Sequence, residues 1–319
     1  MTTGLRVETP INTTVDIGTL FVAVFLTVDC WYQQHGLALL RGKRGRKPDL
    51  SDTEVITLLL MRDFLPFPSE RQYLAFIRAN YRDWFPQLVD RSQFNRRARN
   101  LRTLVEQLRR HWLDQLGATL AQEFLLDTKP VPVITYKRSK KQSEFAGHAG
   151  YGVCPSRSMK YFGFKLVALT TLDGIPVAYE LVPANTDERA AAEEVLAYVW
   201  NSDIFGDKGF IGEEWQLDQQ DWHGNRIWTT KRVNQTQQNH PDFDRWLNSK
   251  RQRIEGAFNE VQNVGRDIER LLVKTMSGLC TQAEGSRFIG VTAKMASHTL
   301  KTVLRCLFNI DVLSFSYIN

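Results

Sequence analysis

Two short apolar runs of this sequence each end at an aspartate. The first is Phe124-Leu125-Leu126-Asp127 and the second is Ile204-Phe205-Gly206-Asp207. Apolar runs of this length, bounded by polar residues, are typical of buried strands. A carboxylate at the end of such a strand lies at the edge of the sheet. The two runs therefore predict a fold that contains a β-sheet with an acidic residue at the end of each of two strands.

The region from Glu123 onward alternates strands and helices. Two strand-like runs, Tyr161–Thr171 and Ile175–Val182, are joined by Leu172-Asp173-Gly174, which is typical of a β-hairpin turn. The remaining predicted elements are strands over 131–134 and 224–228, helices over 185–200 and 242–272, and a helix between Asp207 and Gly224. Three strands, a helix, a strand, a helix, a strand and a helix is the order of an RNase H-like α/β domain. We therefore predict a mixed sheet with flanking helices.

In an RNase H-like sheet the first and fourth strands are neighbours, so Asp127 and Asp207 are expected to lie together. Two buried like charges side by side are unfavourable unless a cation lies between them. Hard oxygen ligands select Mg²⁺ or Mn²⁺, and a pair of ions about 4 Å apart can activate a water or a 3′-hydroxyl. A single carboxylate at a strand end is more often solvated or a cap. The metal-ion hypothesis therefore depends on the whole set of carboxylates.

A third carboxylate, Glu255, is placed on the predicted long helix. It shares the polar face of that helix with Arg251, opposite the apolar stripe. Glu255 is thus expected to complete a site for two metal ions, and Arg251 to contact a phosphate or orient a carboxylate. Lys208, next to Asp207, is a candidate for neutralising the scissile phosphate, although a surface lysine beside a turn is the commoner case. The predicted catalytic and metal-binding residues are Asp127, Asp207 and Glu255.

The positive charge of the chain is concentrated near its N-terminus. The chain has 319 residues and a net charge of +6, and the segment from Arg41 to Arg110 holds sixteen Lys or Arg against eight Asp or Glu. Such an excess is expected of a DNA-binding region, although a solvated surface can show it by chance. The length indicates more than one domain. The predicted parts are a helical segment (1–40), a basic DNA-binding region (41–119), an RNase H-like catalytic domain (120–275) and a C-terminal helical segment (276–319).

Helix start signals divide the basic region. Ser51-Asp52-Thr53-Glu54 and Ser69-Glu70-Arg71-Gln72 have the capping-box pattern, and a third helix with one apolar face is predicted from Ser92 to Trp112. An all-helical cluster with a last helix rich in arginine resembles a helix-turn-helix arrangement, in which that helix enters the major groove. A helical bundle with a solvated basic face is the alternative. The arginines that fall largely off the apolar stripe are Arg96, Arg97, Arg99, Arg102, Arg109 and Arg110, and the first four are the candidate DNA contacts.

Other classes of protein receive little support from the sequence. Cys30, Cys154, Cys280 and Cys306 lie far apart, in a pattern that indicates neither a disulfide framework nor a zinc site. The apolar run Ile17–Val28 is shorter than the roughly 18–20 residues of a membrane span. Its flanks do not have the pattern of a signal peptide. We expect it to form a buried helix of a cytoplasmic protein.

Several motifs are shared with a known family. The most specific is Gly206-Asp207-Lys208-Gly209-Phe210, which follows Pro183-Ala184-Asn185-Thr186-Asp187 at a characteristic distance. The other shared motifs are Leu50–Thr57, Arg91–Arg97, Leu126–Val133, Tyr161–Leu166 and Arg253-Ile254-Glu255. Through nearly its whole length the chain resembles the DDE transposases of bacterial insertion sequences, most closely the insertion sequence 982 family. Related transposases often carry a tyrosine and a lysine where this chain has Asn248 and Gln262.

The resemblance implies a function. Asp127, Asp207 and Glu255 would be the DDE residues of an enzyme that recognises terminal inverted repeats, cuts DNA at the ends of the element and joins the freed 3′-hydroxyl to a target. It implies double-stranded DNA as the partner, a homodimer in the DNA complex, and a cytoplasmic location at the nucleoid. A metal-dependent endonuclease without strand transfer and a repeat-binding protein without catalysis remain as alternatives.

Two further features have more than one interpretation. The basic stretch Lys137–Lys141, with Arg157 and Lys160, either follows DNA near the active site or is a charged loop. Trp228 stands where some transposases stack a flipped base, but packing in the core is the commoner role for a tryptophan on a strand.

Overall fold

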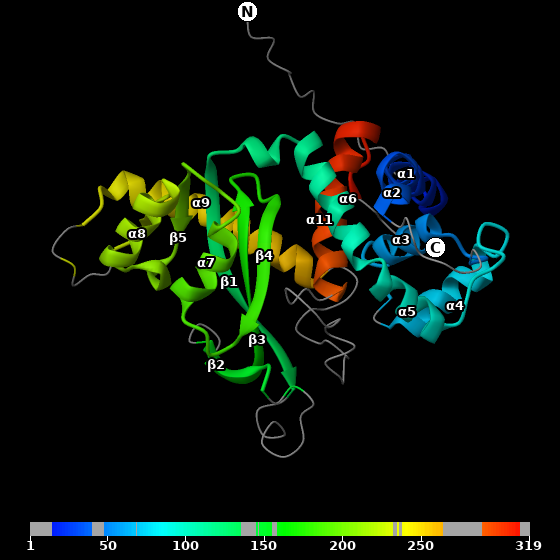
Figure 1. The fold of residues 1–319 in the computed structure, drawn as a ribbon, viewed down its shortest axis with the longest axis horizontal. Coiled ribbons are helices and arrows are strands. Elements are labelled where there is room, and N and C mark those ends of the chain that lie inside the picture. Colours follow the sequence, from blue (N-terminus) through cyan, green and yellow to red (C-terminus); the bar gives the residue numbers. More distant parts are fainter. Residues whose placement is uncertain are drawn as a thin grey trace, which may run out of the picture.

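The computed structural model describes residues 15–39, 48–67, 69–134, 145, 147–154, 158–231, 235, 238–263 and 289–312. The predicted basic stretch Lys137–Lys141 and Arg157 lie outside the described residues, as does the connector 41–47. A helical region and a mixed sheet with flanking helices lie side by side (Figure 1). This arrangement confirms the predicted fold class.

The helical region is built from the N-terminal part of the chain. Its elements are α1 (Ile17–Trp31), η1 (Tyr32–Gly36), α2 (Leu37–Leu39), α3 (Asp52–Met61), α4 (Glu70–Asn80), α5 (Arg91–Asn100), α6 (Arg102–Gln115) and η2 (Ala118–Leu120). The predicted capping box is present at α3, where Ser51 Oγ accepts from the Glu54 amide and the Glu54 carboxylate accepts from the Ser51 amide. Helix α1 coincides with the predicted buried helix, and Val24 and Val28 are in the core.

The predicted single helix from Ser92 to Trp112 is wrong, because two helices meet at Leu101. Leu101 ends α5 and precedes α6, with φ −92° and ψ 1°. Its side chain is buried at the corner. The bend lets α5 pack against α3 and α4 while α6 packs against a helix from the far end of the chain, α11 (Ile289–Phe308). One straight helix could not reach both partners.

Within the part of the chain that the structure describes, the sheet has six strands. They are β1 (Glu123–Ile134), β2 (Gly150–Cys154), β3 (Met159–Thr171), β4 (Pro176–Pro183), β5 (Asp203–Gly206) and β6 (Arg226–Thr229). On one edge β3 pairs antiparallel with β1, and on the other it pairs first with β2 and then with β4. Strands β5 and β6 extend the sheet beyond β1 in parallel. The predicted hairpin is therefore confirmed, and Gly174, with φ 86°, supplies its turn.

Strand β1 is longer than predicted. The sequence indicated two strands, over 124–127 and 131–134, but β1 is continuous through Pro130 and Pro132. Because β5 pairs only with residues 123–125, the edge of β1 beyond them has no partner strand among the described residues. Prolines two residues apart place their missing N–H groups on one edge, which an unpaired edge tolerates. Asp127 thus lies inside a strand and does not end one.

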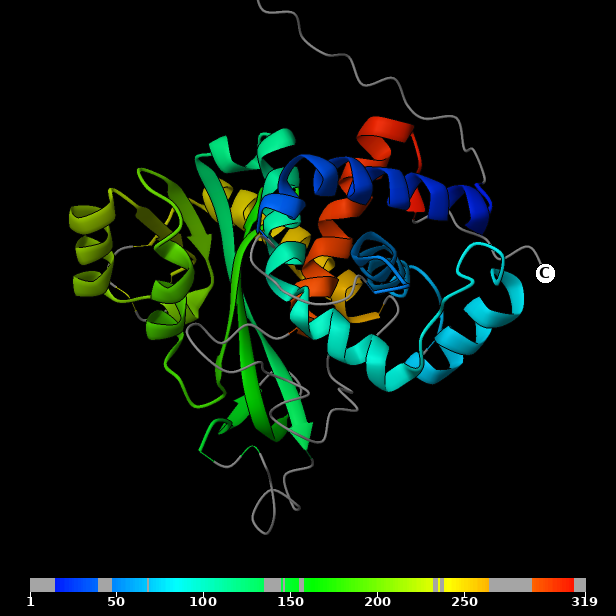
Figure 2. The same ribbon diagram turned by 45° about the vertical axis from the view of Figure 1, so that its right-hand side comes forward.

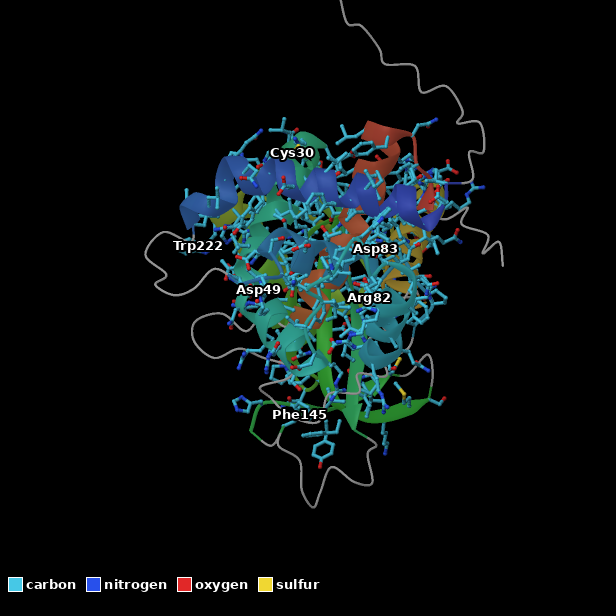
Figure 3. All side chains as sticks on the ribbon, turned by 90° about the vertical axis from the view of Figure 1, so that its right-hand side faces the viewer. Cys30, Asp49, Arg82, Asp83, Phe145 and Trp222 are labelled. Carbon is cyan, nitrogen blue, oxygen red and sulfur yellow. The ribbon has the colours of Figure 1, made fainter. Side chains whose placement is uncertain are left out.

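Two other boundaries differ from the predictions. Strand β2 was not predicted, because glycine has a low strand propensity and both Gly150 and Gly152 lie in it. At these positions a side chain would collide with Asn185 and Tyr161 respectively. The helix predicted over 185–200 is α7 (Glu188–Leu196), which ends four residues early. Phe145 lies at the same end of the molecule as β2 (Figure 3) and packs edge-on against Phe164.

The two faces of the sheet have separate cores. Phe124 and Leu126 of β1 pack with α7, while Leu125 packs with α9 (Pro241–Asn263). Helix α8 (Glu213–His223) lies against β6. Helices α11 and α6 lie between the sheet and the other helices of the N-terminal region (Figure 2). No helix within the described residues is long and apolar enough to cross a membrane.

Candidate active site

The pairing of two parallel strands brings Asp127 and Asp207 to the same level. Leu125 of β1 lies opposite Phe205 of β5, and each aspartate comes two residues after this pair. Neighbouring strands are about 4.8 Å apart, so the backbones at the two aspartates are adjacent. Asp207 directly follows β5 and begins the short helix η4 (Lys208–Phe210). The predicted meeting of these two carboxylates at one edge therefore follows from the register.

Asp127 is a partly buried carboxylate. Because it alternates with Leu126 along β1, its side chain lies on the α9 face of the sheet, as that of Leu125 does. Its Oδ1 accepts a hydrogen bond of 2.8 Å from the Thr128 amide. Burial raises the pKa of Asp127 to about 7, and the negative charges of Asp207 and Glu255 also raise it, while Arg251 lowers it. The ionised form of Asp127 is thus disfavoured in this site unless a positive charge nearby stabilises it.

Asp207 is held from two sides. Its Oδ1 accepts from the Gly209 amide at 2.7 Å, which fixes the turn into η4. Its Oδ2 lies 3.8 Å from Nη2 of Arg251 on α9. Nε of Arg251 is buried without a hydrogen-bond partner among the described residues. Arg251 therefore supplies positive charge to both aspartates.

Glu255 lies one helical turn beyond Arg251. Ile254 and Phe258 pack α9 against the sheet, so this turn of the helix passes over the strand that carries Asp127. The Glu255 side chain is exposed, and its charge acts on Asp127. Asp127 on β1 is therefore close enough to Asp207, after β5, and to Glu255, on α9, for both charges to affect its pKa.

The site contains a fourth carboxylate, to which we assigned no role from the sequence. Oε1 of Glu188, at the start of α7, lies 3.5 Å from the Thr128 hydroxyl and 3.9 Å from Nζ of Lys165. Burial raises the pKa of Glu188, and so does the charge of Asp207. In the sequence Glu188 looks like an ordinary acidic residue in the first turn of a helix. Only the tertiary fold reveals its neighbours.

Two glycines allow the turn after β5 to pack closely. A Cβ at Gly206 would lie 2.7 Å from the ring of Phe210. A Cβ at Gly209 would overlap Oε2 of Glu188 and lie 2.9 Å from Oδ1 of Asp207. Space for neighbouring side chains thus explains both glycines.

The donor set suits a hard divalent cation. Carboxylates gather beside the end of β5, and the pKa values of two of them, Asp127 and Glu188, are raised, which is the condition that a bound cation relieves. In their present positions, no three His, Cys, Asp or Glu side chains of the described residues surround one point closely enough to hold an ion. Metal binding by these residues therefore requires their side chains to move from these positions.

The candidate DNA contacts fall into different environments. Arg96 on α5 and Lys208 beside the active site are exposed, whereas Arg99 and Arg102 are partly buried. Arg97 binds within the fold, with Nη2 2.7 Å from Asp52 and Nη1 donating to the Leu50 carbonyl. The guanidinium of Arg97 thus joins α5 to the start of α3.

The expectation that Arg109 lies on the basic outer face is wrong. Its side chain is 2% exposed and donates to Glu106 and to the carbonyls of Pro176 and Val177 in β4. The Tyr179 hydroxyl donates to the same glutamate at 2.9 Å. Arg109 therefore connects α6 with the sheet.

The expectation that Trp228 packs in the core is also wrong. Its side chain is 42% exposed at the edge strand β6. Its Nε1 donates to Asp203 at 2.7 Å, and its ring centroid lies 5.8 Å from that of Phe243. Trp228 thus lies at the surface, and its contacts with Asp203 and Phe243 hold one side of its ring in place.

These features define an RNase H-like domain with acidic residues within β1, directly after β5 and on the long helix α9. Residues 118–271 match the model of a family described as "Transposase DDE domain". The chain therefore contains a transposase DDE domain, and the matched range includes all four carboxylates of the site. No curated protein and no solved structure matches the chain.

Proposed function

We propose that this protein is a DDE transposase of the insertion sequence 982 type. It binds the terminal inverted repeats of its element and catalyses metal-dependent DNA cleavage and strand transfer. The observation that carries the proposal is the parallel register of β1 and β5, which places Asp127 beside Asp207 within the matched transposase domain.

In this proposal Asp127, Asp207 and Glu255 hold Mg²⁺ or Mn²⁺, because hard cations prefer carboxylate oxygens. When bound, two such ions activate a water or a 3′-hydroxyl and stabilise the leaving oxygen. Arg251 keeps Asp207 oriented from α9. Lys208 is exposed next to Asp207 and neutralises the scissile phosphate.

DNA binding is assigned to the helical region and to the rim of the active site. Arg96, on the exposed side of α5, contacts a phosphate or a base edge, and Arg99 and Arg102 continue the same basic surface. Arg97 acts on DNA only indirectly, since it sets the position of α5. Two protomers act together, because two element ends must be joined in one complex.

The first test uses the purified protein on duplexes that carry the repeat flanking its own gene, with Mg²⁺, Mn²⁺ or a chelator. Metal-dependent cutting at the repeat end, followed by joining of the 3′ end to a target duplex, is expected. Cutting without joining would favour an endonuclease. Tight binding of the repeat without cutting under any metal would favour a repeat-binding protein that lacks catalysis.

The site itself is tested by three conservative variants. We expect Asp127→Asn, Asp207→Asn and Glu255→Gln each to abolish cleavage, because each removes a charged metal ligand, while gel-shift affinity for the repeat stays measurable. Glu194→Gln is the matched control, since Glu194 is an exposed carboxylate further along α7. Wild-type cleavage rates in any of the three variants would overturn the assignment of that residue.

A further inference from the structure

Glu188 reaches the active site from the face of the sheet opposite α9. It follows Asp187, whose side chain caps α7 by accepting from the Arg189 amide at 2.9 Å. Helix α7 is fixed to its face of the sheet by Ala191, Ala192 and other buried residues. The start of α7 is thus a rigid support, and its first carboxylate is directed by the packing of the helix.

One oxygen of Glu188 is attached to the strands. Oε1 accepts from the hydroxyl of Thr128, the residue after Asp127, at 3.5 Å. Nζ of Lys165 on β3 lies 3.9 Å from the same oxygen and donates to the Thr186 carbonyl at 3.0 Å. Lys165 is therefore a fixed positive charge that partly offsets Glu188.

The other oxygen lies against the turn that carries Asp207. Oε2 of Glu188 occupies the space that a side chain at Gly209 would need, and Oδ1 of Asp207 borders the same space. Gly209 is not among the glycines with positive φ, so its backbone angle does not require glycine. A side chain at this position would instead displace the Glu188 carboxylate from the turn.

We propose that Glu188 is a positioning residue for the metal-binding carboxylates. It joins β1, through Thr128, to the turn at Gly209, and so sets the spacing between Asp127 and Asp207. Its negative charge also strengthens the attraction of the site for a divalent cation, and Lys165 weakens that attraction. The inference rests on the proposed function, because it assumes that Asp127 and Asp207 hold the cation.

The test measures Mn²⁺ binding to the full-length protein without DNA, by electron paramagnetic resonance of the free ion, together with Tm in chelator. Glu188→Gln keeps the shape and loses the charge, and we expect Mn²⁺ affinity to fall on the order of 10-fold, as for other residues that support metal ligands. Lys165→Gln is expected to shift the affinity in the opposite direction. Glu194→Gln, on the same helix, should bind Mn²⁺ as the wild type does.

A purely structural role gives a different pattern. It would lower Tm in Glu188→Gln at unchanged Mn²⁺ affinity, and Lys165→Gln would not tighten binding; either result overturns the proposal. Asp207→Asn separates this inference from the proposed function. If Asp207→Asn loses Mn²⁺ while Glu188→Gln retains wild-type affinity, only the role of Glu188 is refuted. If Asp207→Asn binds Mn²⁺ normally, the metal site itself is refuted.

Discussion

At the scale of single residues, Asp127 makes the metal-free protein sensitive to pH. Burial raises the pKa of Asp127 from 3.8 to about 7. Between these values the folded state holds a proton that the unfolded state has released. Stability from this group is therefore fully present below pH 3.8 and is lost as pH rises through about 7.

We therefore predict that the protein in chelator is less stable at pH 8 than at pH 5, by on the order of 2 kcal/mol from this group. Asp127→Asn should remove that part of the dependence, because an amide has no proton to lose. Urea unfolding at the two pH values measures the effect. Mg²⁺ should oppose it at pH 8, since the ion binds the ionised carboxylate. An equal pH dependence in the variant would contradict the prediction.

Two adjacent arginines of α5 should behave differently. Arg97 is bound to Asp52 and to the Leu50 carbonyl, so Arg97→Ala is expected to reduce stability by about 1.5–3 kcal/mol. Arg96 is exposed, so Arg96→Ala should leave stability unchanged, weaken DNA binding and reduce its salt slope by about 1. Unfolding curves and binding titrations at several salt concentrations test both. A loss of stability in Arg96→Ala would show that its contacts lie within the fold.

The residues that sequence patterns missed share one physical cause. The spacing of apolar residues predicts which side of a helix faces the core. It does not predict which residues of other segments contact the polar side. The partners of Arg109 include two backbone carbonyls in β4, and those of Glu188 include Thr128 and Lys165. Such contacts depend on tertiary packing, whereas Asp127 and Asp207 were predictable because each follows its own apolar run.

At the scale of elements, the sequence predicted what local pattern and strand order determine. The hairpin of β3 and β4, the short strand β5 and the long helix α9 all carry strong local signals. The continuity of β1 through two prolines depends on an edge that β5 leaves unpaired, and the bend at Leu101 depends on two different packing partners. The local sequence of β1 or of the helix near Leu101 does not predict these neighbouring elements.

The contact between α6 and β4 should be sensitive to loss of one charge. Arg109→Met leaves Glu106 as a buried carboxylate without its main counter-ion, at an expected cost of about 3–5 kcal/mol. Adding Glu106→Gln should restore part of the stability, because the uncompensated charge is gone. Arg110→Met, half exposed on the next position, is the control and should cost under about 1 kcal/mol. Urea unfolding of the wild type, Arg109→Met, Glu106→Gln, the double variant and Arg110→Met tests this, and additive effects of the pair would argue against coupling.

At the scale of the whole molecule, α11 contributes side chains to the cores of two regions. Leu300 and Leu304 belong to the core of the helical region, while Val291 and Met295 of the same helix belong to the core under the sheet. The helix also reaches both regions through polar contacts, because Ser297 bonds to Leu60 and Asp63, and His298 lies 3.2 Å from the Gly174 carbonyl. Loss of packing on one side of α11 should therefore also destabilise the core on its other side.

We predict that Leu300→Ala lowers the free energy of unfolding by about 2–5 kcal/mol. Amide exchange should accelerate to a similar degree in α3 and in β3, although Leu300 belongs only to the helical core. Leu307→Ala, on the same helix but 62% exposed, should change neither. Acceleration confined to α3 would show that the two regions unfold independently.

The position of α11 in the chain has a consequence for synthesis on the ribosome. Both of these cores lack side chains of α11 until residues 289–308 have left the exit tunnel, so we expect the sheet to complete its packing only after α11 has been made. We therefore expect a chain that ends before residue 289 to pack incompletely and to be degraded faster than the intact protein. It would not accumulate as a folded fragment that competes with intact protein.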